Sequence, residues 1–193
     1  MSMNILVLDN YDSFTYNLVH IVRQLGFSPD VIRNDQIGVA EAGAYDKILL
    51  SPGPGIPEEA GILKSLIRTW GPVKSILGIC LGHQAIAEVF GAALFNLPAV
   101  QHGVISHAEI ISTSDCIFRG ITPVFQATHY HSWAVDPTTI PDELEVTAIN
   151  QAGLIMAVRH RVFNVRGLQF HPESMMTPEG PKMIANWLLH AAS

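Results

Sequence analysis

The stretch Gly78-Ile79-Cys80-Leu81-Gly82-His83-Gln84 places a cysteine between two glycines directly after an apolar run. This is the pattern of a nucleophile elbow, a sharp strand-to-helix turn whose strained backbone requires residues without a side chain on both flanks. A helix that begins after Cys80 would favour the thiolate, which is the nucleophilic form. The alternative is a buried structural cysteine, but that role would need neither Gly78 nor Gly82. The stretch therefore predicts a nucleophilic Cys80 in an α/β fold.

Outward from this turn, apolar runs of strand length alternate with stretches at helical spacing, as in βαβ units that build a parallel sheet. In the second half, Gln151-Ala152-Gly153 separates two short apolar runs as in a hairpin, which indicates antiparallel additions. The sequence predicts an open, mostly parallel central sheet flanked by helices, with antiparallel additions in the C-terminal half. The expected strands are 5–8, 47–50, 75–79, 147–150, 154–158 and 165–170; the expected helices are 14–25 (capped by Asp12 or Ser13 and ended by Gly26), 58–70, 85–90 and one that begins at Thr177-Pro178.

Length and composition favour one domain, residues 1–193, with a core large enough to need neither metal nor disulfide. Apolar residues make up 48% of the chain and charged residues 15%, which suits a sheet buried on both faces. A net charge of −6 argues against nucleic acid and anionic membrane as partners. Two cysteines and the absence of a signal-like or membrane-spanning run predict a cytoplasmic protein. Cys116 is expected to have only a packing role.

A nucleophilic cysteine needs a base, and His171 is the best placed of nine histidines. It stands in Gln169-Phe170-His171-Pro172-Glu173, directly after an apolar strand. In an extended segment, residues two apart point the same way, so Glu173 can orient the imidazole toward Cys80. Together these residues predict a Cys80, His171, Glu173 catalytic triad.

Attack on a carbonyl also requires hydrogen-bond donors for the oxyanion that forms. The backbone N–H of Leu81 is one source, and Gly53 or Gly55 in the Pro-Gly loop after strand 47–50 is another. That loop could instead be a rigid turn, and it lacks the pattern of a phosphate-binding loop. His129 and His131 can share one strand face, but no further ligands accompany them, so no metal site is expected.

Four motifs together resemble the class I, triad-type glutamine amidotransferases over almost the whole chain: Ser51-Pro52-Gly53-Pro54-Gly55-Ile56-Pro57, residues 78–84, Tyr130-His131-Ser132 and His171-Pro172-Glu173. The opening Asp9 to Asn17 is similar to one subgroup, the glutaminase subunits that serve anthranilate and 4-amino-4-deoxychorismate synthesis. The resemblance implies a flavodoxin-like fold. It also implies that glutamine is hydrolysed through a thioester on Cys80.

The resemblance further implies that ammonia passes to a separate chorismate-binding synthase subunit, which would make anthranilate with Mg²⁺ held by that partner. No cofactor is expected on this chain. The alternatives are supply of aminodeoxychorismate synthesis, a non-catalytic regulatory subunit and a stand-alone cysteine hydrolase of another amide or ester. The positions that match the family's glutamine-binding residues are Gly53, Pro54, Gly55, Gln84, Ser132 and Trp133.

Two positions depart from the subgroup pattern. Val104 follows His102-Gly103 where lysine is usual, and His129 stands where arginine commonly precedes Tyr-His-Ser. Neither position belongs to the expected triad. Either could alter contacts with the synthase subunit or the way in which that subunit activates glutamine hydrolysis.

Overall fold

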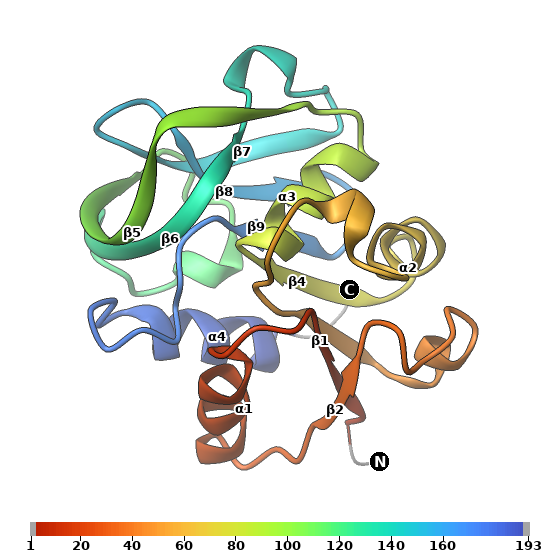
Figure 1. The fold of residues 1–193 in the computed structure, drawn as a ribbon. Helices are drawn as coiled ribbons and strands as arrows, with labels where there is room; N and C mark the ends of the chain where they lie inside the picture. The colour runs from red at the N-terminus through yellow and green to blue at the C-terminus, as the bar shows by residue number, and fades with distance from the viewer. Residues whose placement is uncertain (1–2, 191–193) are drawn as a thin grey trace.

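A mixed sheet organises the part of the chain that the computed structural model describes, residues 3–190. Within it, nine strands follow the order β2-β1-β3-β4-β9-β8-β7-β5-β6 (Figure 1). The first five strands in this order are parallel, and from β9 onward every neighbouring pair is antiparallel. The strands are β1 (Ile5–Asp9), β2 (Asp30–Arg33), β3 (Lys47–Leu50), β4 (Ser75–Ile79), β5 (Leu94–Ile110), β6 (Val124–Val135), β7 (Leu144–Asn150), β8 (Ile155–His160) and β9 (Val165–Leu168).

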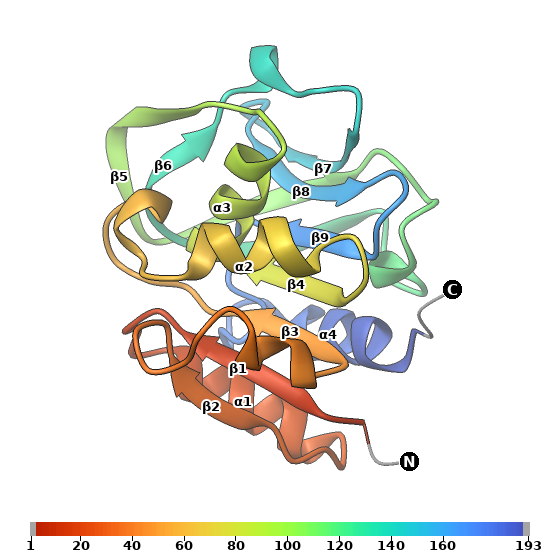
Figure 2. The same ribbon diagram turned by 90° about the vertical axis from the view of Figure 1, so that its right-hand side faces the viewer.

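The parallel strands are apolar throughout because helices cover both of their faces. In β1, Ile5 and Val7 belong to one buried cluster with residues of α1 (Thr15–Gln24) and α4 (Gly180–Leu189). Leu6 and Leu8 belong to a second cluster with α2 (Leu63–Trp70) and α3 (Leu81–Val89). Figure 2 shows α2 and α3 on the side of the sheet that faces the viewer.

The antiparallel half curls away from the parallel half and arches over α3 (Figure 1). Its long pair, β5 and β6, is interrupted by register shifts between Asn96 and Gln101 and between His102 and Val104. Such irregularities bend a strand pair and increase its twist. The curl is what places residues of β6 near the carboxyl ends of β3 and β4, where Cys80 lies.

The predicted α/β class and mixed sheet are confirmed, but several boundaries were wrong. The segment expected as one helix, 58–70, is a short 3-10 turn at Pro57–Glu59 followed by α2 from Leu63. Gly61 separates them with φ +53°, and its Cα packs so closely on Asn34 that a Cβ would lie 2.7 Å from a backbone oxygen. This left-handed, tightly packed residue is incompatible with a continuous helix.

Other differences concern the ends of elements and three strands that were not predicted. Helix α4 begins at Gly180 rather than at Thr177-Pro178, with Pro181 in its first turn. Strand β9 ends at Leu168, not at residue 170. The residue before α1 is Phe14, and the Asp12 side chain accepts its backbone N–H at 2.7 Å. Strands β2, β5 and β6 were not predicted as elements.

Between residues 3 and 190, every helix is too short or too polar to cross a lipid bilayer.

Candidate active site

Cys80 occupies a strained turn between β4 and α3. Its backbone has φ 51° and ψ −99°, and residues other than glycine rarely adopt such a positive φ. Its N–H donates to the carbonyl oxygen of Leu168 on β9 at 2.7 Å, which ties the turn to the neighbouring strand. A Cβ on Gly78 would lie 2.4 Å from the backbone of Gly82, and one on Gly82 would lie 2.8 Å from Leu50. Both glycines therefore permit the close approach that the elbow pattern predicts.

His171 and Glu173 contact each other through a turn. Nδ1 of His171 and Oε1 of Glu173 are 2.6 Å apart, and both side chains are buried. The sequence predicted this contact, but it assumed that residues 171–173 are extended, and that assumption was wrong. Residues 171–174 form a turn in which Ser174 donates its N–H to the His171 carbonyl at 3.2 Å. Pro172, with its fixed φ, occupies the second position of this turn, where proline is favoured.

The imidazole of His171 lies beside the Cys80 sulfur. Burial by itself would lower the pKa of His171, but its interactions with Cys80 and with Glu173 outweigh burial and raise the pKa to about 10. Among the described residues, Nε2 of His171 has no partner at regular hydrogen-bond geometry. A protonated imidazole beside the sulfur would stabilise a thiolate at Cys80.

Two aromatic rings hold the His171 imidazole in place. The ring of Tyr130 meets it edge-on with centroids 5.1 Å apart, and the ring of Phe14 does so at 5.7 Å. These two rings also contact each other, with centroids 5.0 Å apart. Phe14 comes from the loop after β1 and Tyr130 from β6, so distant segments fix the orientation of one side chain.

The predicted glutamine-binding residues gather around Cys80. A pocket of about 180 Å³ opens next to the thiol, at the carboxyl ends of β3 and β4. This is the edge at which open parallel sheets bind their ligands. Its lining includes all six predicted residues, Gly53, Pro54, Gly55, Gln84, Ser132 and Trp133.

Gly53 packs directly against the start of α3. A Cβ at this position would lie 2.7 Å from the side chain of Leu81 and 2.7 Å from the carbonyl oxygen of Asn10. The Leu81 N–H belongs to the first turn of α3, where no earlier helical carbonyl can accept it. The two expected oxyanion donors, on Gly53 and Leu81, therefore stand on adjoining segments at the pocket.

Gln169 is a polar neighbour of Cys80 that was not predicted from the sequence. Its Nε2 donates to the Cys80 sulfur at 3.7 Å, and its Oε1 accepts from Gln84 at 3.2 Å. Gln84 also donates to the carbonyl oxygen of Trp133 at 2.8 Å, so it fixes which end of the Gln169 amide faces sulfur. Its position in the sequence could have indicated this role, because Gln169 precedes His171 by two residues in the segment that enters the site.

His129, one of the departures from the family pattern, is buried and cannot touch a partner directly, since only 2% of it is exposed. Nδ1 of His131 lies 2.8 Å from the Trp133 carbonyl, which only accepts, so that nitrogen carries the proton. Nε2 of His131 then accepts from His129 at 3.4 Å, and His129 accepts from Ser106 at 2.7 Å. Val104, the other departure, is 38% exposed on β5 and remains available for contacts.

Buried neutral histidines should make the fold sensitive to acid. Burial lowers the pKa of His83 and of His129 to about 3 and that of His131 to about 4. The pKa of a histidine in the unfolded chain is near 6.5. Below this pH the unfolded chain binds protons that the folded chain does not, so the free energy of unfolding decreases as the pH is lowered. Three such histidines together lower the free energy of unfolding by roughly 4 kcal/mol for each pH unit below about 6.

We expect the urea midpoint to fall steeply between about pH 6.5 and pH 5. The variant His131→Asn should reduce the slope of unfolding free energy against pH by about one third, whatever its effect on stability at pH 7. A slope that is flat in this range would contradict the neutral state of these histidines.

Comparisons with known proteins agree on one family. The class-I glutamine amidotransferase family model matches residues 6–191. Aminodeoxychorismate synthase component 2 of Klebsiella aerogenes is 46% identical over 186 residues, which are 95% of this chain and 98% of that protein. Anthranilate synthase component 2 of Mycobacterium tuberculosis is 44% identical over 191 residues, which are 96% of this chain and 82% of that protein.

Solved structures support the same fold. A crystal structure attributed to a GMP synthase subunit from Thermoplasma acidophilum matches with a TM-score of 0.87 at 26% identity, covering 97% of this chain and 93% of that one. A glutamine amidotransferase from Thermotoga maritima matches with a TM-score of 0.75 at 16% identity, covering 98% and 97% of the two chains. The second likeness concerns the fold alone.

Proposed function

Because the chain belongs to the class-I glutamine amidotransferase family, we propose that it is the glutaminase subunit of a chorismate-using synthase. The observation that carries this proposal is the meeting of Cys80 and the His171–Glu173 pair beside a pocket lined by all the predicted glutamine-binding residues. Anthranilate synthesis is one of the two roles that this proposal includes. Supply of aminodeoxychorismate synthesis is equally supported, since relatives of both names match at 46% and 44% identity.

The proposed reaction proceeds through a thioester. The Cys80 thiolate attacks the side-chain carbonyl carbon of glutamine, and the N–H groups of Gly53 and Leu81 donate to the oxyanion. His171, held by Glu173, protonates the leaving nitrogen, so that the C–N bond breaks and ammonia departs. Water, deprotonated by His171, then attacks the thioester carbon and releases glutamate with the regenerated thiol.

A purely regulatory subunit is the less favoured reading. Such a subunit would need the fold but would have no use for a strained Cys80 whose φ is 51° or for two glycines packed against backbone. A stand-alone hydrolase of another amide is disfavoured by the names of the relatives, which are components of two-part synthases. Free Cys80 and Cys116 fit a reducing compartment, and we propose the cytoplasm.

The experiment combines the chain with two chorismate-using synthase subunits, one for each pathway. Glutamate release from glutamine is measured with and without each subunit, and the aminated product made from chorismate is identified by its mass. We expect low release alone and stimulation by at least one partner, with the product naming the pathway. Release that no partner stimulates would contradict the subunit role.

Gln169 should tune the reactivity of the thiol. Replacing it with methionine, which has similar length but no N–H, removes the donor at 3.7 Å from sulfur. A hydrogen bond of this kind contributes about 1 kcal/mol, so alkylation of Cys80 by iodoacetamide at pH 7 should slow about fivefold.

Gln126→Met is the matched control, because this glutamine donates to the Met176 carbonyl and lies outside the lining of the Cys80 pocket. Its alkylation rate at pH 7 should equal that of the unaltered protein. A Gln169→Met protein with an unchanged alkylation rate would show that the Gln169 contact does not stabilise the thiolate.

A further inference from the structure

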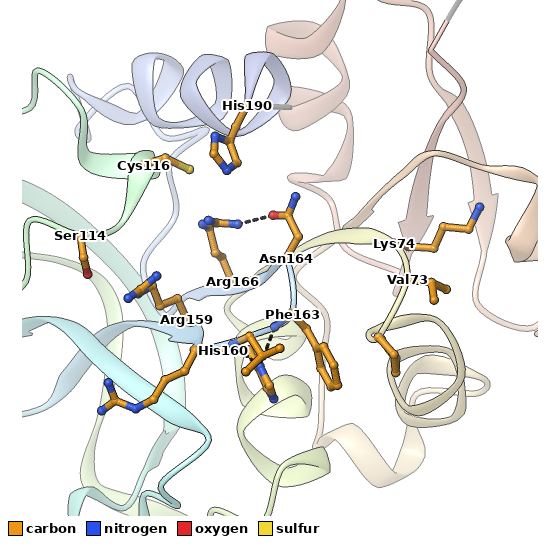
Figure 3. Close-up of a pocket in the computed structure, with 13 residues that line it drawn as sticks. Val73, Lys74, Ser114, Cys116, Arg159, His160, Phe163, Asn164, Arg166 and His190 are labelled. Atoms are coloured by element: carbon orange, nitrogen blue, oxygen red, sulfur yellow. Dashed lines mark hydrogen bonds between the residues drawn. The ribbon is translucent and has the colours of Figure 1, made fainter. Parts of the chain in front are cut away.

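Figure 3 shows a second concavity, which has a volume of about 520 Å³. It lies at the opposite edge of the sheet from Cys80. Lys74 borders it just before β4 begins, whereas Cys80 follows the end of the same strand. Asn164 and Arg166 border it at the start of β9, and His190 borders it after α4. The two sites are thus separated by the length of β4, about 16 Å.

The walls of this concavity are strongly basic. Its lining holds Lys74, Arg159, Arg161 and Arg166 and no carboxylate, in a chain with only 11 lysines and arginines and a net charge of −6. Two carboxylates outside the lining pair with these cations. Asp115 lies 2.7 Å from Arg166, and Glu145 lies 2.6 Å from Arg159 and 3.5 Å from Arg161. Four cations against two carboxylates leave a positive excess at the cavity.

The same positive potential contributes to lowered pKa values of two neighbouring groups. Burial, followed by repulsion from Arg166, lowers the pKa of Lys47 to about 8. Burial and then repulsion from Arg166, Lys47 and Arg119 lower the pKa of His190. Both shifts indicate a positive potential at the Arg166 end of the cavity.

Several hydrogen-bond donors converge on one point of this cavity. Arg166 is only 7% exposed, and its guanidinium is fixed by Asp115 and by the side-chain oxygen of Asn164. The Asn164 Nδ2 is buried and has no hydrogen-bond partner among residues 3–190. Figure 3 shows the Asn164 amide, the Arg166 guanidinium and the His190 ring around the same space. A buried amide donor without an acceptor is unfavourable, and a turn of the Asn164 side chain toward the cavity would let a ligand oxygen satisfy it.

We propose that this cavity binds the phosphate group of a small molecule. A guanidinium presents a fork of donors that matches phosphate oxygens, and the Asn164 amide and the His190 ring would reach further oxygens of the same tetrahedral group. A group that carries two negative charges also fits an excess of cations better than a single carboxylate does. The volume leaves room for the rest of the molecule beside the phosphate.

Inorganic pyrophosphate is the probe, and isothermal titration calorimetry with ³¹P NMR is the measurement. We expect saturable one-to-one binding with a dissociation constant below about 1 mM, weakened by added salt because the attraction is ionic. Succinate, a dianion without a phosphate group, should bind at least about tenfold more weakly. Equal affinity for succinate would overturn the assignment of phosphate, and no saturable binding of pyrophosphate would overturn the site.

The variant Asn164→Asp keeps the oxygen that accepts from Arg166 but replaces the unpartnered donor with negative charge. Pyrophosphate affinity should fall at least about tenfold, while Asn17→Asp, the same change at an exposed position of α1, should leave it unchanged. His190→Ala removes only the imidazole donor and should also weaken pyrophosphate binding. This variant replaces Asn164→Asp in the test if Asn164→Asp does not fold. Unchanged affinity in either folded variant would overturn the proposal.

Pyrophosphate binding at this cavity does not depend on the proposed glutaminase activity. Cys80→Ala should bind pyrophosphate with unaltered affinity, because Cys80 lies at the other edge of the sheet. Loss of glutamine hydrolysis with intact pyrophosphate binding, or the reverse, would therefore separate the two proposals.

Discussion

Replacing Cys80 with alanine is expected to reduce glutamate release from glutamine at least about a thousandfold, with or without a synthase partner. Alanine has no atom that can form the thioester. No other side chain in the pocket stands at the same turn to replace the Cys80 thiol. The fold should survive. Cys80 is 5% exposed and its side chain is small, so the variant should show the same circular dichroism and bind glutamine.

Cys116→Ala is the matched control for this prediction. Cys116 is a free, half-buried cysteine outside the Cys80 pocket, and it lines the basic cavity instead. Its loss should leave partner-stimulated glutamate release within about twofold of the unaltered protein, as for a substitution away from the reacting groups. Stimulated release that persists in Cys80→Ala would exclude the thioester mechanism.

Gly78→Ala is expected to destabilise the fold strongly. The added Cβ would lie 2.4 Å from the carbonyl carbon and 2.5 Å from the oxygen of Gly82, which are backbone atoms that cannot rotate away. Relief of this overlap requires β4 and α3 to separate, so we expect a loss of about 3 kcal/mol or more. Urea unfolding followed by tryptophan fluorescence measures it.

A second glycine substitution separates overlap from backbone conformation. Gly153 lies in a turn with φ +76°, and no atom lies within 4 Å of the place that a Cβ would take, so Gly153→Ala should cost only about 1 kcal/mol. If Gly78→Ala costs no more than Gly153→Ala, the close packing of the elbow does not determine the stability of the fold.

The elbow and the parallel strands could be predicted because their signals are local. Two glycines around Cys80 and continuous apolar runs for β1, β3 and β4 each follow from the demands of a single segment. Strands β5 and β6 carry no such signal. Much of β5 is exposed and its register is broken twice, so neither a continuous run nor a strict alternation marks it.

The candidate site shows the same division between local and long-range information. Sequence spacing placed Glu173 beside His171, although the contact runs through a turn rather than an extended strand. The roles of Phe14 and Tyr130 against His171 could not be predicted, because they depend on the curl of the antiparallel strands around α3. Tertiary packing, not residue type, decides which aromatic side chains meet.

Strand β9 follows the other eight described strands in the chain, yet in space it lies between β4 and β8. A ribosome must therefore complete residues 165–168 before the two halves of the sheet can be joined, and His171 emerges only after them. On the mechanism proposed above, a nascent chain that already exposes Cys80 lacks the imidazole that would act as its base. Translation would thus keep the thiol without its base until residue 171 has been added.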